Sequence, residues 1–471
     1  MNRTGIARPS ARDGNRGRND VLNNSLFRVV LNVGLPLLTV QMISMLAVSY
    51  TNDIYSREFG KLVFLVTGVV SAAISLFQSA CGSVSSATWI RSAAAYARGE
   101  RRQVNRAAVN SLYSVTLMVS LCILMLLSGK GAIFRMMNIP REIYREAGMY
   151  YDTQMLLMPI GGISTMLNTI ITARGSRGMV FAENLMMTCV QVVSAVVFIV
   201  ILKLGFWGFL LGGIPVTLLH VVIQFWLLRK CGFFIGLEKD SFRPDWKSIF
   251  GNIKYGFLLY MQMILCCISE MAISTQSNRH LDMDAIATVS ILLPVTGPLS
   301  ICSTLCSVFV PQNYGAGKTQ RLKRFAAGSI GFAAVYGTGC ACFLIAAGGW
   351  YFGTLFDDPV MIALGREYWF WYGLACIPLA MIYAIRIFFD SVGMAKVSML
   401  SGVGELAGRL VCAFWLIPCF GYIGRFAAPL FGWGLGGLLM VIMYLALRKR
   451  IYQQCEENGK RETGEREEAA V

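Results

Sequence analysis

The stretch LLPVTGPLSICSTLCSVFVPQNYGAGKTQRLKRF, residues 292–325, joins a long apolar run to a short turn rich in glycine and cations. The sequence Gly317-Lys318-Thr319 could close a nucleotide-binding glycine loop, which needs an earlier glycine where this chain has Gln312. That loop also follows a buried strand, whereas the apolar run over residues 292–310 is long enough to cross a membrane. The stretch therefore predicts a membrane helix that ends in a polar turn and excludes the nucleotide site.

The composition extends this interpretation to the whole chain. Of 471 residues, 55% are hydrophobic and only 14% are charged, against about a quarter charged in soluble domains. Apolar runs of about twenty residues recur and favour helical spans over a membrane barrel. The sequence predicts an all-α integral membrane protein with no large soluble domain. Its twelve spans are expected near residues 28–52, 61–88, 107–129, 148–173, 179–202, 205–228, 250–277, 285–311, 326–350, 362–389, 397–420 and 426–447.

The net charge of +16 has its simplest explanation in this topology. With the N-terminus inside, and with residues near span ends counted with the adjoining segment, 30 Lys and Arg fall on inner segments and 10 on outer ones, as the positive-inside rule expects. Both termini are therefore expected in the cytoplasm and the protein in the plasma membrane. A nucleic-acid partner is unnecessary, and the charged tail over residues 453–471 is expected to be disordered and dispensable.

The residues that usually carry enzymatic chemistry are scarce. The 14 Cys are scattered mostly within predicted spans, without metal-ligand spacing, and the only histidines are His220 and His280. No H-E-x-x-H or G-x-S-x-G motif stands at a plausible depth. We therefore expect no enzyme, no metal site and no cofactor other than a coupling ion.

The two halves of the sequence repeat each other. Residues 95–108 align with residues 313–326 at an offset of 218, and the same offset pairs Gly175 with Gly393. An even number of spans per half gives two parallel lobes related by a pseudo-twofold axis normal to the membrane. The expected organisation is a basic tail over residues 1–26, an N-lobe over 27–230, a linker over 231–249, a C-lobe over 250–448 and a charged tail over 449–471.

Four segments resemble the multidrug and toxic compound extrusion (MATE) family of transporters. These are QNYGAGKTQRLKR at residues 312–324, SVGMAKVSMLSGVGELAGR at 391–409, TARGSRGMVFAENLMM at 172–187 and GLPLLTVQ at 34–41. The resemblance implies a twelve-helix exporter of small organic, often cationic, compounds in exchange for Na⁺ or H⁺. It implies a small-molecule substrate and membrane lipid as partners, with no obligate protein partner. A flippase for a lipid-linked substrate, from the same superfamily, is the alternative.

Acidic residues within spans are the candidates for ion coupling, because a carboxylate in a low-dielectric cavity can hold either a cation or a cargo molecule. Glu270 lies one helical turn beyond Cys266, where many family members carry an acid. Asp53 resembles a family acid that spacing would place at Thr51 or Asn52. The alternatives are an interface carboxylate bonded to Ser or Gln neighbours for Glu270 and a solvated loop carboxylate for Asp53.

Two i, i+4 pairs, Arg386 with Asp390 and Glu405 with Arg409, are expected to form structural or gating ion pairs. Neutral residues that could line a substrate cavity complete the candidate set. They are Gln41, Gln191, Tyr260 and Gln262. The alternative is bonding between helices for Gln41 and Gln262, and packing or contact with lipid for Tyr260.

Overall fold

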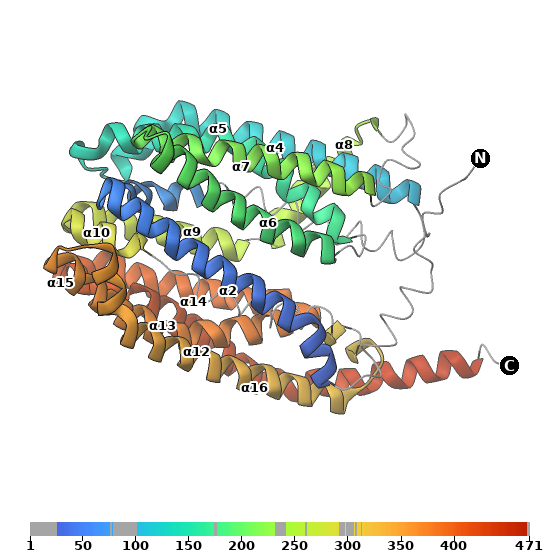
Figure 1. Ribbon diagram of the computed structural model, residues 1–471. Coiled ribbons are helices and arrows are strands. Elements are labelled where there is room, and N and C mark those ends of the chain that lie inside the picture. The colour runs from blue at the N-terminus through green and yellow to red at the C-terminus, as the bar shows by residue number, and fades with distance from the viewer. Residues whose placement is uncertain are drawn as a thin grey trace.

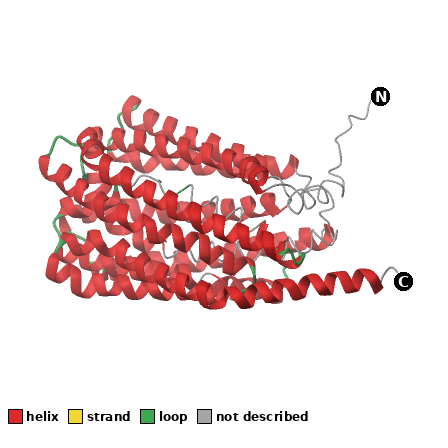
Figure 2. Ribbon diagram, turned by 90° about the horizontal axis from the view of Figure 1, so that it is seen from below, coloured by secondary structure: helices red, strands yellow, loops and turns green. Residues whose placement is uncertain are grey.

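The protein is a bundle of long helices (Figures 1 and 2). The computed structural model describes residues 26–75, 101–173, 177–230, 242–259, 261–291 and 309–468 except Gln312, with three single positions at 78, 297 and 306. Its α-helices are α2 (Leu26–Phe59), α4 (Arg101–Met136), α5 (Tyr144–Ala173), α6 (Arg177–Ala195), α7 (Phe206–Lys230), α8 (Trp246–Leu259), α9 (Met261–His280), α10 (Met283–Ser290), α12 (Thr319–Leu355), α13 (Pro359–Ser391), α14 (Ala395–Val411), α15 (Ile417–Phe420) and α16 (Tyr422–Glu468).

Among the described residues, several helices are long and apolar enough to cross a membrane. Six meet that test, over Ala182–Ile201, Phe206–Lys230, Thr319–Leu355, Pro359–Ser391, Lys396–Phe420 and Tyr422–Gly459. A further pair, Thr39–Phe59 and Leu62–Ser75, is bent by 117° at the outer turn predicted between the first two spans. The prediction of an all-helical membrane protein is confirmed.

The predicted duplication reappears in the helix bounds. Shifted by 218 residues, the end of α4 at Met136 falls one residue from the end of α12 at Leu355, and the end of α6 at Ala195 falls two residues from the end of α14 at Val411. A π-helical segment follows each of the second pair, at Val196–Ile201 and at Cys412–Leu416. Matching irregularities at matching places support two copies of one helical plan.

The two halves meet at the end of the bundle opposite to the one where α2 begins and α16 ends (Figure 1). There Asn52 Nδ2 of α2 donates to Tyr351 Oη of α12 at 3.3 Å, and Asn278 Nδ2 of α9 donates to the Met137 carbonyl at 2.9 Å. Lys61 forms an ion pair with Asp284 across the same junction. We call the end where the two halves meet the junction end, and the end where α2 begins and α16 ends the terminal end.

The predicted seventh span contains α8 and α9, which lie on either side of position 260. Helix α8 packs on α4, where Asn252 Nδ2 donates to Ser111 Oγ at 3.2 Å and the Asp245 N–H donates to Asn110 Oδ1 at 2.9 Å. Helix α9 packs on α14 instead. Residues just beyond the proposed lobe boundary at 250 thus contact the first half.

The C-terminal segment does not follow the expectation of disorder. Helix α16 continues to Glu468, and its residues 454–459 lie against the turn at Tyr314 and Gly317. Tyr314 Oη donates to Gln454 Oε1 at 3.3 Å, and Asn458 Nδ2 donates to the Tyr314 carbonyl at 3.5 Å. The expectation failed because it considered only the charge of the tail and not the turn at Tyr314, against which the helix packs.

Gly317 is the tightest point of that docking. Its φ of +66° is unfavourable for other residues, and a Cβ built on it would lie 2.2 Å from Cα of Gly459. Gly317→Ala should therefore destabilise the protein by about 1–3 kcal/mol, measured as a lower thermal unfolding midpoint in detergent. Gly328→Ala in α12 is the control, since its Cβ meets nothing within 4 Å. Equal midpoints for both variants would contradict the contact.

Candidate functional site

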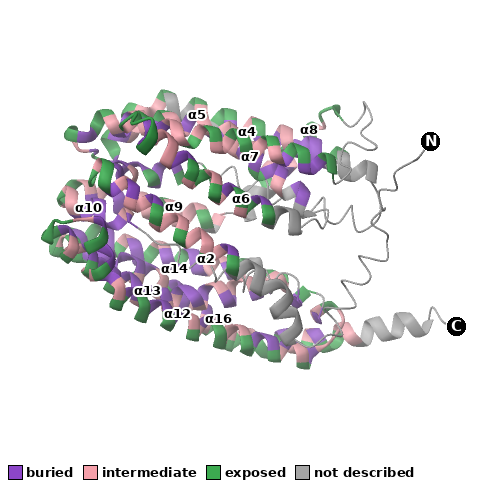
Figure 3. Cartoon of the chain, in the orientation of Figure 1, coloured by how far each residue is buried: buried purple, intermediate pink, exposed green. Residues whose placement is uncertain are grey.

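Close packing of α14 on α16 positions the charged residues of the second half. A Cβ on Gly408 would lie 2.4 Å from the Phe431 carbonyl oxygen, and one on Gly404 would lie 2.9 Å from Cα of Gly436. Glycines spaced by four residues on each helix let the two backbones approach, as in other membrane helix pairs. Interior faces of α13, α14 and α16 are buried accordingly (Figure 3).

Glu270 of α9 lies between two arginines. Its Oε1 accepts from Arg425 Nη2 of α16 at 2.9 Å, and its Oε2 is 3.4 Å from Arg409 Nη1 of α14. The arginine side chains are 12% and 10% exposed, whereas Glu270 keeps 36% of its side chain open. Charge-assisted contacts of this kind are about twice as strong as neutral hydrogen bonds. They tie three helices together through one carboxylate.

Glu405 is the second acid of this region and is 5% exposed. Its Oε2 accepts from the Cys266 thiol at 3.1 Å. Arg409 Nη1 also donates to the Cys266 carbonyl at 3.3 Å and to Ser269 Oγ at 3.4 Å. We call Glu270, Glu405, Arg409 and Arg425 the charged seam. Two acids and two arginines leave it formally neutral.

The expected i, i+4 ion pairs are not formed. Within the described residues no ion pair of 4.0 Å or less joins Glu405 to Arg409 or Arg386 to Asp390. Arg409 crosses to α9 because a carboxylate, a carbonyl and a hydroxyl are all within its reach there. The Arg386 guanidinium lies 5.6 Å from the Tyr383 ring centroid, and Asp390 is exposed.

Several other predicted residues lie outside the charged seam. Asp53 Oδ1 accepts from Arg57 Nε at 2.9 Å, and the Arg57 side chain is 73% exposed, so this acid belongs to a local pair near the junction end. Gln41 is half-buried and Gln191 is exposed. Two of the predicted cavity residues are outside the description, Tyr260 as a whole and Gln262 in its side chain.

Arg425 is the site residue that sequence reasoning missed. It stands one residue before the predicted twelfth span and was therefore counted as an outer-loop cation. The alternative for Glu270, a carboxylate bonded to Ser or Gln neighbours, was wrong about the partners because Arg425 was assigned to an outer loop. The signal available in the sequence was an arginine directly before one span together with a lone acid in another span.

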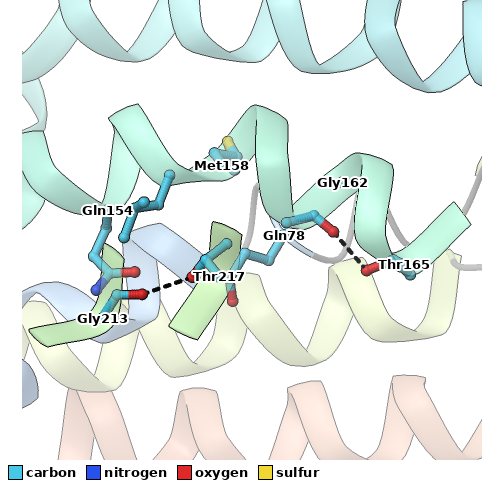
Figure 4. Close-up of a pocket in the computed structure, with 9 residues that line it drawn as sticks. Gln78, Gln154, Met158, Gly162, Thr165, Gly213 and Thr217 are labelled. Carbon is cyan, nitrogen blue, oxygen red and sulfur yellow. Dashed lines mark hydrogen bonds between the residues drawn. The ribbon is translucent and has the colours of Figure 1, made fainter. Parts of the chain in front are cut away.

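A cavity of about 430 Å³ lies in the first half, between α5 and α7 (Figure 4). Its lining combines amides and hydroxyls with small and apolar residues. Thr165 Oγ1 donates to the Gly161 carbonyl and Thr217 Oγ1 to the Gly213 carbonyl, both at 2.9 Å. These hydroxyls are bonded to their own helices, so the amides of Gln78 and Gln154 are the lining groups best able to bond a guest. The lining residues are Gln78, Gln154, Leu157, Met158, Gly161, Gly162, Thr165, Gly213 and Thr217.

Removing one arginine from Glu270 tests the charged seam. Arg425→Gln should lower stability by about 1.5–3 kcal/mol, because it removes a hydrogen bond to a charged group. Glu270→Gln combined with Arg425→Gln should cost less than the sum of the single variants. Thermal unfolding of the wild type, the two single variants and the double variant in one detergent gives this cycle, with Arg57→Gln as the exposed-pair control. Strict additivity would show that the two side chains do not interact.

Comparisons with known proteins agree with this architecture. Residues 259–413 match the family model MatE. A structure of an inward-facing multidrug resistance MATE family transporter of the MOP superfamily matches at TM-score 0.70 and 13% identity, covering 89% of this chain and 98% of that one. An outward-facing multidrug resistance MATE transporter matches at 0.69 and 15%, covering 92% and 98%. No curated protein sequence matches the chain.

A third structure has the same fold with a different suggested role. It is a MOP superfamily transporter from Pyrococcus furiosus, described as having a binding pocket of reverse polarity that suggests a different function, and it matches at TM-score 0.73 and 13% identity over 92% of this chain and 98% of that one. Residues 259–413 thus carry the MatE pattern, and the chain has the fold of the MATE transporter structures over about nine-tenths of its length.

Proposed function

We propose that the protein is a secondary active exporter of small organic, mainly cationic, compounds, driven by counter-movement of H⁺ or Na⁺. The observation that carries the proposal is the charged seam itself. Three of its four ionisable side chains lie within predicted spans and Arg425 lies directly before one; such groups are expensive to place in a membrane and usually mark ion or substrate pathways. The MATE fold and the drug-resistance descriptions of two structural neighbours favour the same class.

Glu270 is the acid of the seam best placed to exchange partners. Its 36% exposure gives an ion access, while Glu405 is nearly closed off. A proton or Na⁺ on Glu270 would compete with Arg409 and Arg425 and leave their charges less compensated. Contacts between α9, α14 and α16 would weaken as a result. An ion bound this way favours one arrangement of the helices over another, which coupling requires.

The amide-lined cavity in the first half is the proposed substrate site. Its volume of about 430 Å³ is within the usual range for small-molecule sites. Met158 and Leu157 offer soft apolar contacts, and Gln78 and Gln154 offer donors and acceptors without fixed charge. Such a lining suits varied guests. The preference for cations rests on the carboxylates Glu270 and Asp53 rather than on the cavity wall.

A lipid-linked flippase is the second candidate. Arg409 and Arg425 could hold a pyrophosphate, and the Pyrococcus relative shows that the fold is compatible with a pocket of other polarity. Here each arginine already contacts Glu270, which disfavours an anion. A lipid-translocation assay with purified protein separates the two functions.

The proposed setting is the plasma membrane with both termini cytoplasmic, as the distribution of Lys and Arg suggests. The terminal end would then face the cytoplasm. The lobes over residues 27–230 and 250–448 are proposed to rock about the junction end. Small-molecule substrate and lipid are the expected partners.

Ion-driven ethidium transport in proteoliposomes tests the exporter. Separately imposed pH and Na⁺ gradients should identify the coupling ion, and Glu270→Gln should lower gradient-driven transport at least about tenfold because the exchangeable charge is lost. Asp53→Asn tests the second acid. Glu142→Gln, at an exposed acid outside the helical spans, is the control. If gradient-driven transport survives in both acid variants, neither acid takes part in coupling.

A further inference from the structure

Cations of α12 and α16 gather at the terminal end, where the start of α12 lies beside the last part of α16 (Figure 1). Two stand on α12 and three on α16, and all but the first are exposed: Lys323, Arg324, Arg448, Lys449 and Arg450. We call these five side chains the basic cluster. Among the described residues, no ion pair of 4.0 Å or less joins any of them to an acid.

An aromatic side chain connects the two helices of the basic cluster. The Nζ atom of Lys323 on α12 lies 5.2 Å from the centroid of the Tyr452 ring on α16. The Tyr452 Oη is also 2.9 Å from the Oη of Tyr444, two helical turns earlier. Arg448 stands midway between the two tyrosines at intervals of four residues, so it shares their face of α16. The basic cluster is therefore a single site built by two helices.

The charge of the basic cluster is not balanced from within the chain. The nearest acids along α16, Glu456 and Glu457, are exposed and form no ion pair with it. At the junction end, by contrast, Lys61 has Asp284 as its partner. Like charges placed close together repel each other, and an anion between them removes that cost. The basic cluster is therefore suited to an anion from outside the chain.

The surface of α16 next to the basic cluster fits a lipid better than a soluble anion. A stripe of residues at the spacing i, i+4, i+7 and i+11 runs along this helix and ends in the basic cluster. Its members are Leu438, Ile442, Leu445 and Lys449, of which the three apolar ones are 51–56% exposed. From Leu438 to Lys449 a helix rises about 16 Å, and the hydrocarbon of one bilayer leaflet is about 15 Å thick.

Helix α12 has the same arrangement. Val335 and Phe332 are exposed apolar residues, and Gly328 and Arg324 continue their stripe towards the terminal end. Val335 and Arg324 are separated by the same number of residues as Leu438 and Lys449. On both helices an exposed apolar surface as long as an acyl chain thus ends at an unpaired cation of the described structure. This combination matches the two parts of an anionic lipid.

We propose that the basic cluster binds an anionic phospholipid of the leaflet at the terminal end. The phosphate lies among the cations of α12 and α16, and the acyl chains lie on the exposed apolar stripes. Basic groups at the ends of neighbouring membrane helices bind anionic headgroups in this way. The bound headgroup joins α12 to α16 just before residues 454–459 of α16 pack on the turn at Gly317. The site is independent of the transported compound and of the coupling ion.

Native mass spectrometry of the full-length protein with phosphatidylglycerol or phosphatidylcholine tests the site. The wild type should retain phosphatidylglycerol in preference to phosphatidylcholine. Lys323→Gln combined with Arg448→Gln should lower the affinity for phosphatidylglycerol at least about tenfold, because two cations that contact the headgroup are lost. It should leave the affinity for phosphatidylcholine unchanged.

The matched control is Arg229→Gln combined with Lys230→Gln at the end of α7. It also removes two exposed cations from the terminal end, one of them over an aromatic ring, since Lys230 Nζ lies 3.8 Å from the Trp226 ring centroid. The control should keep the preference for phosphatidylglycerol. An equal loss in both double variants would overturn the proposal, because binding would then follow the total charge of the protein rather than this site.

Two further measurements cover the remaining outcomes. Lys449→Gln combined with Arg450→Gln changes exposed positions only and should also weaken phosphatidylglycerol binding, which keeps the test valid if the first variant fails to fold. Equal binding of the two lipids by the wild type would overturn the proposal. If inorganic phosphate raised the thermal unfolding midpoint of the wild type as much as phosphatidylglycerol does, the proposal would also fail, because the acyl chains would then contribute nothing.

Discussion

An ionised side chain inside a membrane needs a partner on another helix, because lipid offers none. Glu270 satisfies this constraint with Arg409 and Arg425, so a single carboxylate holds helix α9 against α14 and α16. The glycine contacts between α14 and α16 make the arrangement possible, since bulkier residues would separate the helices that carry the two arginines. Charge pairing and small-residue packing are therefore parts of one design in the second half.

The first half uses a different arrangement. Its amide-lined cavity has neutral polar groups, and its buried acid, Glu183, lies against a histidine rather than an arginine. The two halves therefore differ: the second half holds the charged seam, whose four charges cancel, and the first half holds the amide-lined cavity.

Helix periodicity and hydrophobicity allowed the membrane fold to be predicted, and the repeat of about 218 residues appears in the ends of α4 and α12. Side-chain partners were predicted less well. Arg386 with Asp390 and Glu405 with Arg409 have the correct spacing for local pairs, yet Arg409 bonds α9 instead. A helix face fixes which residues are neighbours along one helix but not which other helix competes for them. Glu183 and His220, 37 positions apart on adjacent helices, formed no recognisable pattern in the sequence.

The sequence by itself determined that the chain is a helical membrane protein with two related halves, because length, apolarity and repeat offset are local properties that can be read along one dimension. The tertiary structure alone decided which charges meet. It brought Arg425 to Glu270, His220 to Glu183 and the C-terminal helix to the Gly317 turn. The reason is that a buried charge takes its partner from whatever packs against it, and packing is settled only when the helices come together in three dimensions.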